Sequence, residues 1–234
     1  MVLLFNHVSI TMGKRILTFT AFMIFSSLAV LDAQISLVWE AHVIHDYPTL
    51  ADAGNDVEVF ALDGYITWRL YAIMEDGDPL IPDFLTSVLG SGAADLDTLQ
   101  ITFDCCPYQN NQAGPVVSGS QIGDFVTGLF PALLYDSWVT IGMDSSSDDG
   151  AVTFFPAPPW QNDFEECVAN QIYDDSFNGS SWFALPGSNN GIADGDPGTN
   201  LENSVLLGQF TVPQGCQLTQ QGDGDNGSLC INYF

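Results

Sequence analysis

The stretch that decides the fold is Tyr65–Met74, YITWRLYAIM, where β-branched, aromatic and aliphatic residues follow one another without glycine or proline. Successive side chains of a β-strand point to opposite faces, and such residues favour strands. One face would carry the apolar set Ile66, Trp68, Leu70 and Ala72; the other would carry the more polar set Tyr65, Thr67, Arg69 and Tyr71. The stretch therefore predicts one long strand with two different faces.

Shorter alternating runs recur along the chain, separated by clusters of Gly, Asn, Asp, Ser and Pro. We expect a first strand with Leu37, Trp39, Ala41 and Val43 on one face, a second marked by Val57 and Val59, and further strands at 99–103, 137–143, 151–155, 181–185, 205–212 and 228–234. Helical periodicity is confined to 124–134 and to a short helix starting near Asp163. The pattern predicts one all-β domain over 34–234, an antiparallel β-sandwich or jelly-roll-like fold with one or two short helical turns.

The N-terminus has the layout of a secretory signal peptide. Lys14 and Arg15 precede an uncharged run over 16–31 that closes on small residues, so cleavage is expected after Ala33 or Ala29. A retained signal anchor is the alternative, but a spanning helix needs about 20 apolar residues and this run is shorter. We expect a signal peptide over 1–33 and a secreted chain over 34–234. The chain stops at CINYF, in the middle of an expected strand, which suggests a fragment of a longer surface protein.

Charge excludes several functions. The sequence has 3 Lys and Arg against 29 Asp and Glu, and removal of 1–33 takes away Lys14, Arg15 and Asp32, leaving 1 − 28 = −27. Nucleic-acid binding, a Walker A loop, Schiff-base chemistry and attachment to anionic membranes all need cations that are missing. Arg69, the one remaining cation, is expected to stabilise the sheet by stacking on tyrosine rings and pairing with a carboxylate from a neighbouring strand.

Five cysteines lie in the expected secreted chain, which predicts two disulfides in an oxidising compartment. Cys216 and Cys230 flank a turn rich in Gly and Asp and are the simplest pair to propose. Either Cys105 or Cys106 is expected to pair with Cys167. The odd cysteine is either a buried free thiol or the source of an intermolecular disulfide.

No motif of a catalytic site is present. His42 and His45 are three residues apart, so on a strand they would point to opposite faces and would not share a metal ion without a bulge. The chain lacks H-E-x-x-H and G-x-S-x-G, and paired carboxylates carry little information in so acidic a sequence. We therefore assign no catalytic residue and expect a protein that is not an enzyme.

The acidic loops suggest calcium, because Ca²⁺ takes six to eight oxygen ligands on flexible loops. Candidate ligands are Asp194, Asp196, Asn200 and Glu202 in one loop, Asp144, Asp148 and Asp149 in a second, and Asp223 and Asp225 in a third. None has the EF-hand spacing, and the alternative is that Asp, Asn and Gly simply form turns.

Aromatic residues suggest a carbohydrate ligand. Trp39, Trp68 and Trp138 lie within expected strands and should be core residues, whereas Trp160 and Trp182 are candidates for exposed rings that bind sugars. Buried packing is the alternative for both. Asn178 and Asn226 begin N-x-S sequences that would carry glycans only in a eukaryotic host.

Four segments occur in an order typical of one kind of module: GYITWRLYA (64–72), YDSWVTIGMDS (135–145), SSWFALPGS (180–188) and NSVLLGQFTV (203–212). Over residues 64–212 the chain resembles an uncharacterised β-rich module of large secreted proteins from marine and environmental bacteria. The resemblance implies framework roles for Arg69, Trp138 and Trp182 and no activity. The cysteines lie outside that pattern.

We therefore expect a secreted, non-catalytic structural or adhesive β-module of the cell surface or extracellular matrix. Stabilisation by Ca²⁺ is part of this expectation. The alternatives are a carbohydrate-binding module and, third, a hydrolase acting on polysaccharide. The expected partners are other extracellular proteins or glycans.

Overall fold

The computed structural model describes residues 35–74, 84–90, 99–146, 152–155, 160–168, 171–174, 180–185, 188–193, 201–221 and 230–233. Contacts divide the chain into two units, Met1–Asp32 and Ala33–Phe234, and all described residues lie in the second. The expected signal peptide, Asn178 and Asn226 lie outside the described residues. No helix within the described ranges is long and apolar enough to cross a membrane.

Antiparallel strands dominate the described chain. In order they are β1 (Ile35–Ile44), β2 (Tyr65–Met74), β3 (Leu85–Gly90), β4 (Leu99–Phe103), β5 (Trp138–Val139), β6 (Val152–Phe155), β7 (Gln171–Asp174), β8 (Ser180–Ala184), β9 (Ser204–Pro213), β10 (Leu218–Gln221) and β11 (Cys230–Tyr233). Short helices lie between them: α1 (Val57–Phe60), α2 (Asp124–Leu129) and α3 (Trp160–Glu165), with 3₁₀ turns η1 (Asn111–Ala113), η2 (Gly119–Gln121) and η3 (Pro131–Tyr135).

The strands form sheets of order β1-β2-β9-β5, β10-β4-β7 and β11-β3-β8-β6. β2 is central in the first sheet because it pairs along its whole length with β1 on one side and β9 on the other. Its register places Arg69 opposite Glu40 of β1 and opposite Gln209 of β9. The stretch that predicts one long strand therefore forms an inner strand of this sheet, between β1 and β9.

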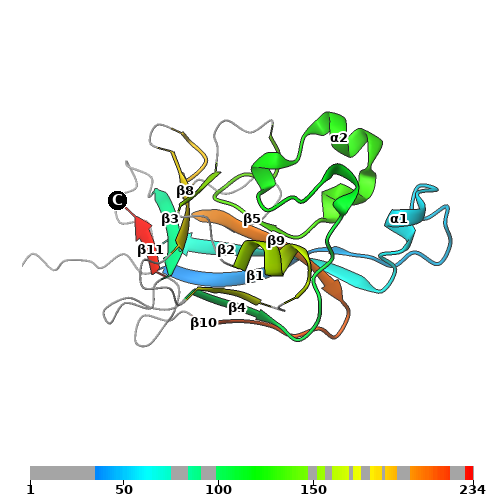
Figure 1. The fold of residues 1–234 in the computed structure, drawn as a ribbon, viewed down its shortest axis with the longest axis horizontal. Helices are drawn as coiled ribbons and strands as arrows, with labels where there is room; N and C mark the ends of the chain where they lie inside the picture. The colour runs from blue at the N-terminus through cyan, green and yellow to red at the C-terminus, as the bar shows by residue number, and fades with distance from the viewer. Residues whose placement is uncertain are drawn as a thin grey trace, which may run out of the picture. The chain divides into compact units, whose positions relative to one another are not determined.

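The main core lies against the apolar face of β2. Leu70, Ala72 and Met74 pack with residues of β9, of β4 and β7, of β3 and β8, and of α3. Figure 1 shows β4 and β10 along one side of the layer that contains β1 and β2, with α2 on the other side. The predicted antiparallel, sandwich-like all-β class is confirmed.

The second face of β2 is covered as well. Tyr71 packs with Leu206 of β9. Val116, Ile122 and Leu133 of the long connection between β4 and β5 close over them, together with Trp138 of β5. Every residue of β9 except Pro213 is buried. β2 and β9 are thus covered on both faces, as are the strands of a sheet that is packed between two layers.

Several local predictions differ from the structure. Val57 and Val59 lie in α1 rather than in a strand, because the Asp56 carboxylate accepts hydrogen bonds from the backbone N–H groups of Glu58 and Val59 and so begins a helix. The strand expected at 137–143 is formed only over β5, and α3 begins at Trp160 rather than near Asp163. The helical prediction for 124–134 is confirmed by α2 and η3.

The turn after β5 explains why a glycine follows Ile141. Gly142 has a φ of 62°, in the left-handed region, and a Cβ on it would overlap the Asn190 carbonyl. Asn190 Nδ2 donates to the Ile141 carbonyl at 2.8 Å, and Trp182 Nε1 donates to the Thr140 carbonyl at 2.9 Å. Residues 140–142 are therefore fixed by side chains from two other parts of the chain.

Candidate functional site

The polar side chains of β2 form a buried layer instead of a surface. Thr67 and Arg69 lie opposite Thr211 and Gln209 of β9, and each of the four is at most 6% exposed. We use the name polar layer for these four residues together with three more buried residues that contact them: His45 and Ser137 through their side chains, and Asp136 through its backbone carbonyl. Because the layer holds most of the residue types that perform catalysis, it is the first place to look for a site.

Arg69 occupies the middle of this layer. Its Nε donates to Gln209 Oε1 at 3.2 Å, and its guanidinium forms an ion pair with Asp144 Oδ2 at 3.1 Å. The predicted pairing with a carboxylate is confirmed, and the partner in this ion pair, Asp144, lies in the loop after β5. Asp144 is also one of the expected calcium ligands, and that role stays a prediction.

His45 begins a chain of hydroxyl contacts. Its Nε2 lies 2.8 Å from Thr67 Oγ1, which lies 2.7 Å from Thr211 Oγ1, and its Nδ1 lies 2.9 Å from the Tyr47 hydroxyl. Burial lowers the pKa of His45 to about 4, so the ring is neutral at physiological pH. His42 is exposed. A register shift does occur between Ala41 and Val43, yet the two imidazoles lie in different surroundings.

Asp136 and Gln209 connect the polar layer to the segment between β4 and β5 that covers it. Gln209 Nε2 donates to the carbonyls of Leu134 and Asp136, at 2.9 and 3.0 Å. Asp136 Oδ1 accepts from the backbone N–H groups of Asn110 and Ser137, at 2.8 and 3.0 Å. The segment that covers β2 and β9 is therefore attached to the sheet by amide and carboxylate contacts.

The arrangement favours a structural role for the layer. The His45 ring nitrogens contact Tyr47 and Thr67, and Ser137 Oγ accepts the Thr211 N–H at 3.0 Å, so the histidine is not the base of that serine. General-base catalysis requires reach to a substrate proton, and these side chains are almost completely buried. What the layer can do is fix the register of two central strands, since the Thr67–Thr211 and Arg69–Gln209 hydrogen bonds both cross from β2 to β9.

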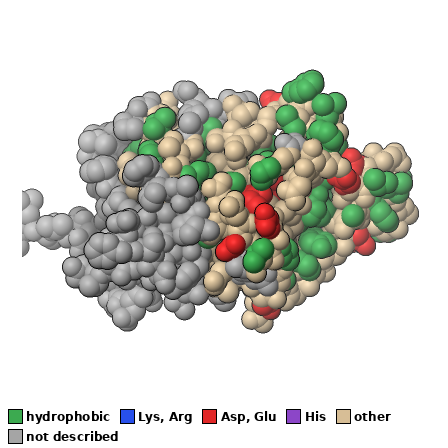
Figure 2. All heavy atoms as spheres, viewed as in Figure 1, with side chains coloured by type: hydrophobic (Ala, Val, Ile, Leu, Met, Phe, Trp, Pro, Cys, Tyr) green, Lys and Arg blue, Asp and Glu red, His purple; other side chains and the backbone are tan. Residues whose placement is uncertain are grey.

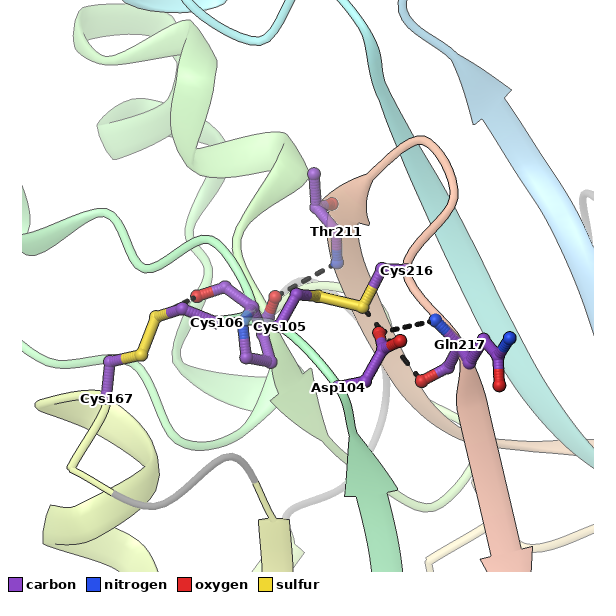
Figure 3. The surroundings of a disulfide bond; sticks show 9 residues. Asp104, Cys105, Cys106, Cys167, Thr211, Cys216 and Gln217 are labelled. Atoms are coloured by element: carbon purple, nitrogen blue, oxygen red, sulfur yellow. Dashed lines mark hydrogen bonds between the residues drawn. A yellow bond between two sulfur atoms is a disulfide. The ribbon is translucent and has the colours of Figure 1, made fainter.

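Adjacent cysteines anchor two different parts of the chain (Figure 3). Cys105 is bonded to Cys216, across 111 residues, and Cys106 is bonded to Cys167, across 61 residues. The prediction that Cys105 or Cys106 pairs with Cys167 is confirmed for Cys106. Two disulfides among the described residues indicate an oxidising compartment, which agrees with export from the cell.

The predicted Cys216–Cys230 bridge is wrong. β10 pairs antiparallel with β4, with Leu218 opposite Phe103, so the turn after β9 brings Cys216 beside Cys105 at the end of β4. Figure 3 shows the two bridges leaving the cysteine pair in opposite directions, toward the β9–β10 turn and toward the end of α3. Proximity in sequence favoured Cys230, but strand pairing decides the partner.

The Asp104 carboxylate lies within 4.8 Å of both Cys105 and Cys216 sulfurs, a grouping that suits a metal in principle. Metal binding needs thiolates, and here both sulfurs are in the disulfide. Asp104 Oδ1 instead accepts the Gln217 N–H at 2.7 Å. The group is a turn stabilised by a covalent bond.

The tryptophans are not sugar platforms. Trp160 and Trp182, expected to be exposed ligand-binding rings, are 3% and 1% exposed, and their rings meet edge to face at 6.0 Å. Both lie in the main core, because α3 and β8 turn these rings inward toward Phe164 and Phe210. Trp138 is also buried, as predicted. The prediction of exposure is therefore wrong for both rings.

Most of the expected calcium ligands lie outside the described residues: Asp148, Asp149, Asp194, Asp196 and Asn200, together with Asp223 and Asp225. Glu202 is described and is exposed. Calcium binding by these loops stays a prediction.

Sequence reasoning missed an exposed apolar surface. Phe125 and Leu129 of α2 are 79% and 59% exposed, and large apolar side chains of neighbouring elements are also exposed: Leu134 of η3, and Val57 and Phe60 of α1. We call these five residues the α1–α2 surface. α1 packs on η3 through Val59 and Ala132, and Figure 2 shows hydrophobic side chains gathered over α2 and α1 with carboxylates between them. The available signal was the run DFVTGLF, which has apolar residues on more than one side of so short a helix.

No protein-family model, no curated protein and no solved structure matches this chain. Its function is therefore inferred from its own residues.

Proposed function

We propose that this protein is an exported, non-catalytic β-module of the cell surface or extracellular matrix, and that the α1–α2 surface binds another extracellular protein. The proposal rests on a contrast between the buried polar side chains of this protein and its exposed apolar ones. Residues with catalytic chemistry are enclosed in the polar layer, whereas large apolar residues that would ordinarily be buried project into solvent. Exposed large apolar side chains that lie close together, such as Phe125 and Leu129 one turn apart on α2, commonly mark a contact site.

The charge of this surface favours one kind of partner. The exposed apolar side chains of α1 and α2 are accompanied by the exposed carboxylates Asp52, Asp63 and Asp124. Lys14 and Arg15 precede the secreted chain, and Arg69 is buried, so the surface carries no cation to balance these carboxylates. A partner segment with lysine or arginine beside apolar residues would complement it in both respects. A second copy of this acidic chain would not.

The test is binding of the unit Ala33–Phe234 to an immobilised amphipathic peptide of leucine and lysine, compared with a matched peptide of leucine and glutamate. The double variant Phe125→Ser/Leu129→Ser removes apolar area without changing the net charge. It should weaken binding to the lysine peptide at least tenfold, about 1.4 kcal/mol.

Val168→Ser is the matched control, because Val168 is 69% exposed but follows α3. It should leave binding unchanged. Equal loss in both variants, or equal binding to the two peptides, would refute the proposed surface. Concentration-dependent self-association that Phe125→Ser/Leu129→Ser abolishes would replace the basic partner with a second copy of this chain.

The carbohydrate-binding alternative rested on Trp160 and Trp182. Both rings lie in the core, so neither of these two tryptophans supports a carbohydrate-binding site.

A further inference from the structure

The two disulfides differ in their access to solvent, although they begin at adjacent cysteines. Cys106 is exposed, and its partner Cys167 is half-buried. Cys105 and Cys216 are both half-buried and pack against the main core. An external thiol can therefore approach the Cys106 end of one bond more easily than either end of the other.

Charge increases this difference between the two bonds. A disulfide is attacked by a thiolate, which is an anion. The Asp104 carboxylate lies within 4.8 Å of both the Cys105 and the Cys216 sulfur, so it repels a thiolate that approaches their bond. The residues on either side of Cys106 in the chain are a bonded cysteine and a proline, and neither carries a charge.

The backbone at Cys167 has a conformation that favours glycine. Its φ is 53°, in the left-handed region. The Cys167 N–H donates to the Phe164 carbonyl at 3.3 Å, and the Val168 N–H donates to the Asp163 carbonyl at 2.8 Å. These two bonds form the Schellman motif that ends a helix, in which glycine is the usual residue at the left-handed position. The disulfide thus holds a side chain at a strained position, and opening the bond lets that position relax.

Exposed or strained disulfides exchange readily with external thiols, whereas structural ones resist. The Cys106–Cys167 bond has an exposed end and a left-handed residue, and neither Cys105 nor Cys216 has a positive φ. We propose that the Cys106–Cys167 bond is a thiol-exchange site at which an external thiol becomes attached to Cys106.

The exchange is a balanced substitution at sulfur. The external thiolate attacks Cys106 Sγ, a new S–S bond forms there, and the bond to Cys167 breaks. Cys167 leaves as a thiolate and takes a proton from water. No net electrons are transferred, so no oxidant or reductant is needed. Attack is expected at Cys106 rather than at Cys167, because Cys167 is half-buried and follows Glu165 and Glu166 in the chain.

Exchange at this site releases one anchor and keeps the other. The end of α3 separates from the segment after β4, while the Cys105–Cys216 bond still attaches that segment to the β9–β10 turn (Figure 3). α3 also packs in the main core through Trp160 and Phe164, so the fold should persist. The site is independent of the α1–α2 surface. Because the secreted chain is strongly acidic, a thiol with a positive charge should react faster than one with a negative charge.

The experiment treats the folded unit Ala33–Phe234 with cysteamine, which is a cationic thiol, or with 2-mercaptoethanesulfonate, which is an anionic one, at equal concentration and ionic strength. Acid stops the exchange at successive times, and mass spectrometry of peptic peptides identifies the cysteine that carries the added thiol. Cys230→Ser is the matched control, because it removes the fifth cysteine as an internal attacking thiol and leaves both bonds intact.

We expect cysteamine on Cys106 and a thiol on Cys167, formed about tenfold faster than any opening of the Cys105–Cys216 bond. The rate should be the same in Cys230→Ser and lower with the sulfonate. Equal rates for the two bonds, attachment at a cysteine other than Cys106, or exchange only in denaturant would overturn the proposal.

A second pair of variants tests the backbone argument. Cys106→Ser/Cys167→Gly and Cys106→Ser/Cys167→Ser both lack the bond and differ only at the left-handed position. The glycine variant should have a melting temperature about 2–4 °C higher, because glycine adopts this φ without strain. An equal or higher melting temperature of the serine variant would overturn the conclusion that the bond holds a strained backbone.

Discussion

Removing the Cys105–Cys216 bond should destabilise the fold strongly, because this bond closes the longer of the two loops. A disulfide removes loop-closure entropy from the unfolded chain, and the effect grows with the logarithm of loop length. For a separation of 111 residues the stabilisation is about 4.8 kcal/mol at room temperature. For the 61 residues of Cys106–Cys167 it is about 4.3 kcal/mol. A Cys216–Cys230 bridge would close a loop of only about 14 residues, worth about 3 kcal/mol.

The assay is urea unfolding of Cys105→Ser/Cys216→Ser and Cys106→Ser/Cys167→Ser, with Cys230→Ser as the control that leaves both bridges intact. Each double variant should lose about 4–5 kcal/mol, and the two losses should differ by less than about 1 kcal/mol. For a unit of this size the loss corresponds to a decrease in melting temperature of about 10–20 °C. Peptic peptides prepared at acid pH without reductant should contain the two bridges described here.

A loss near 3 kcal/mol for Cys105→Ser/Cys216→Ser that Cys230→Ser alone reproduces would refute the reasoning. That outcome would mean that Cys216 pairs with Cys230 and that β10 does not lie against β4.

Two other predictions concern the polar layer. Arg69→Met should lower the free energy of unfolding in urea by about 2–4 kcal/mol, because it leaves the buried Gln209 carboxamide oxygen without its donor. Asp144→Asn should lower it by less than about 1 kcal/mol, since the Asp144 side chain is 38% exposed. Equal losses in the two variants would mean that the ion pair carries the stabilisation. His45 has a pKa of about 4 in the folded protein and about 6.5 when unfolded, so its contribution is fully present above about pH 6.5 and is lost as pH falls toward 4. The stability difference between the wild type and His45→Gln should shrink over that range, and a constant difference would contradict the shift.

The long central strands were predictable because their signal is local and strong. Ten residues without a helix cap or a turn former, alternating in polarity, left β2 few alternatives. β9 is equally long and is almost entirely apolar on either side of Gly208 and Gln209. Alternation also separated the two faces of β2 correctly: Leu70 faces the main core and Thr67 faces the polar layer. It did not show that the polar face is covered, because the cover comes from residues 105–143, where the periodic segments 124–134 and 137–143 are short and give no indication of what they pack against.

The candidate site was less predictable because it depends on contacts between distant residues. The sequence placed Arg69 in a sheet and paired it with a carboxylate, but not with Asp144, 75 residues away. Asp136 precedes a short strand and Glu165 lies in a short helix, and no local pattern shows that both are buried. The tryptophan error has the same cause, since a ring beside prolines or serines is exposed or buried according to what packs over it.

Burial of the single arginine has a consequence for proteolysis. In residues 34–234 trypsin has one possible cleavage point, the bond after Arg69, and that bond lies in β2 with neighbours on both edges and both faces. A protease needs several extended residues free of the sheet, so cleavage there requires the sheet itself to open. The folded chain should resist trypsin until it unfolds as a whole, and the rate of tryptic cleavage becomes a direct measure of the population of the open state.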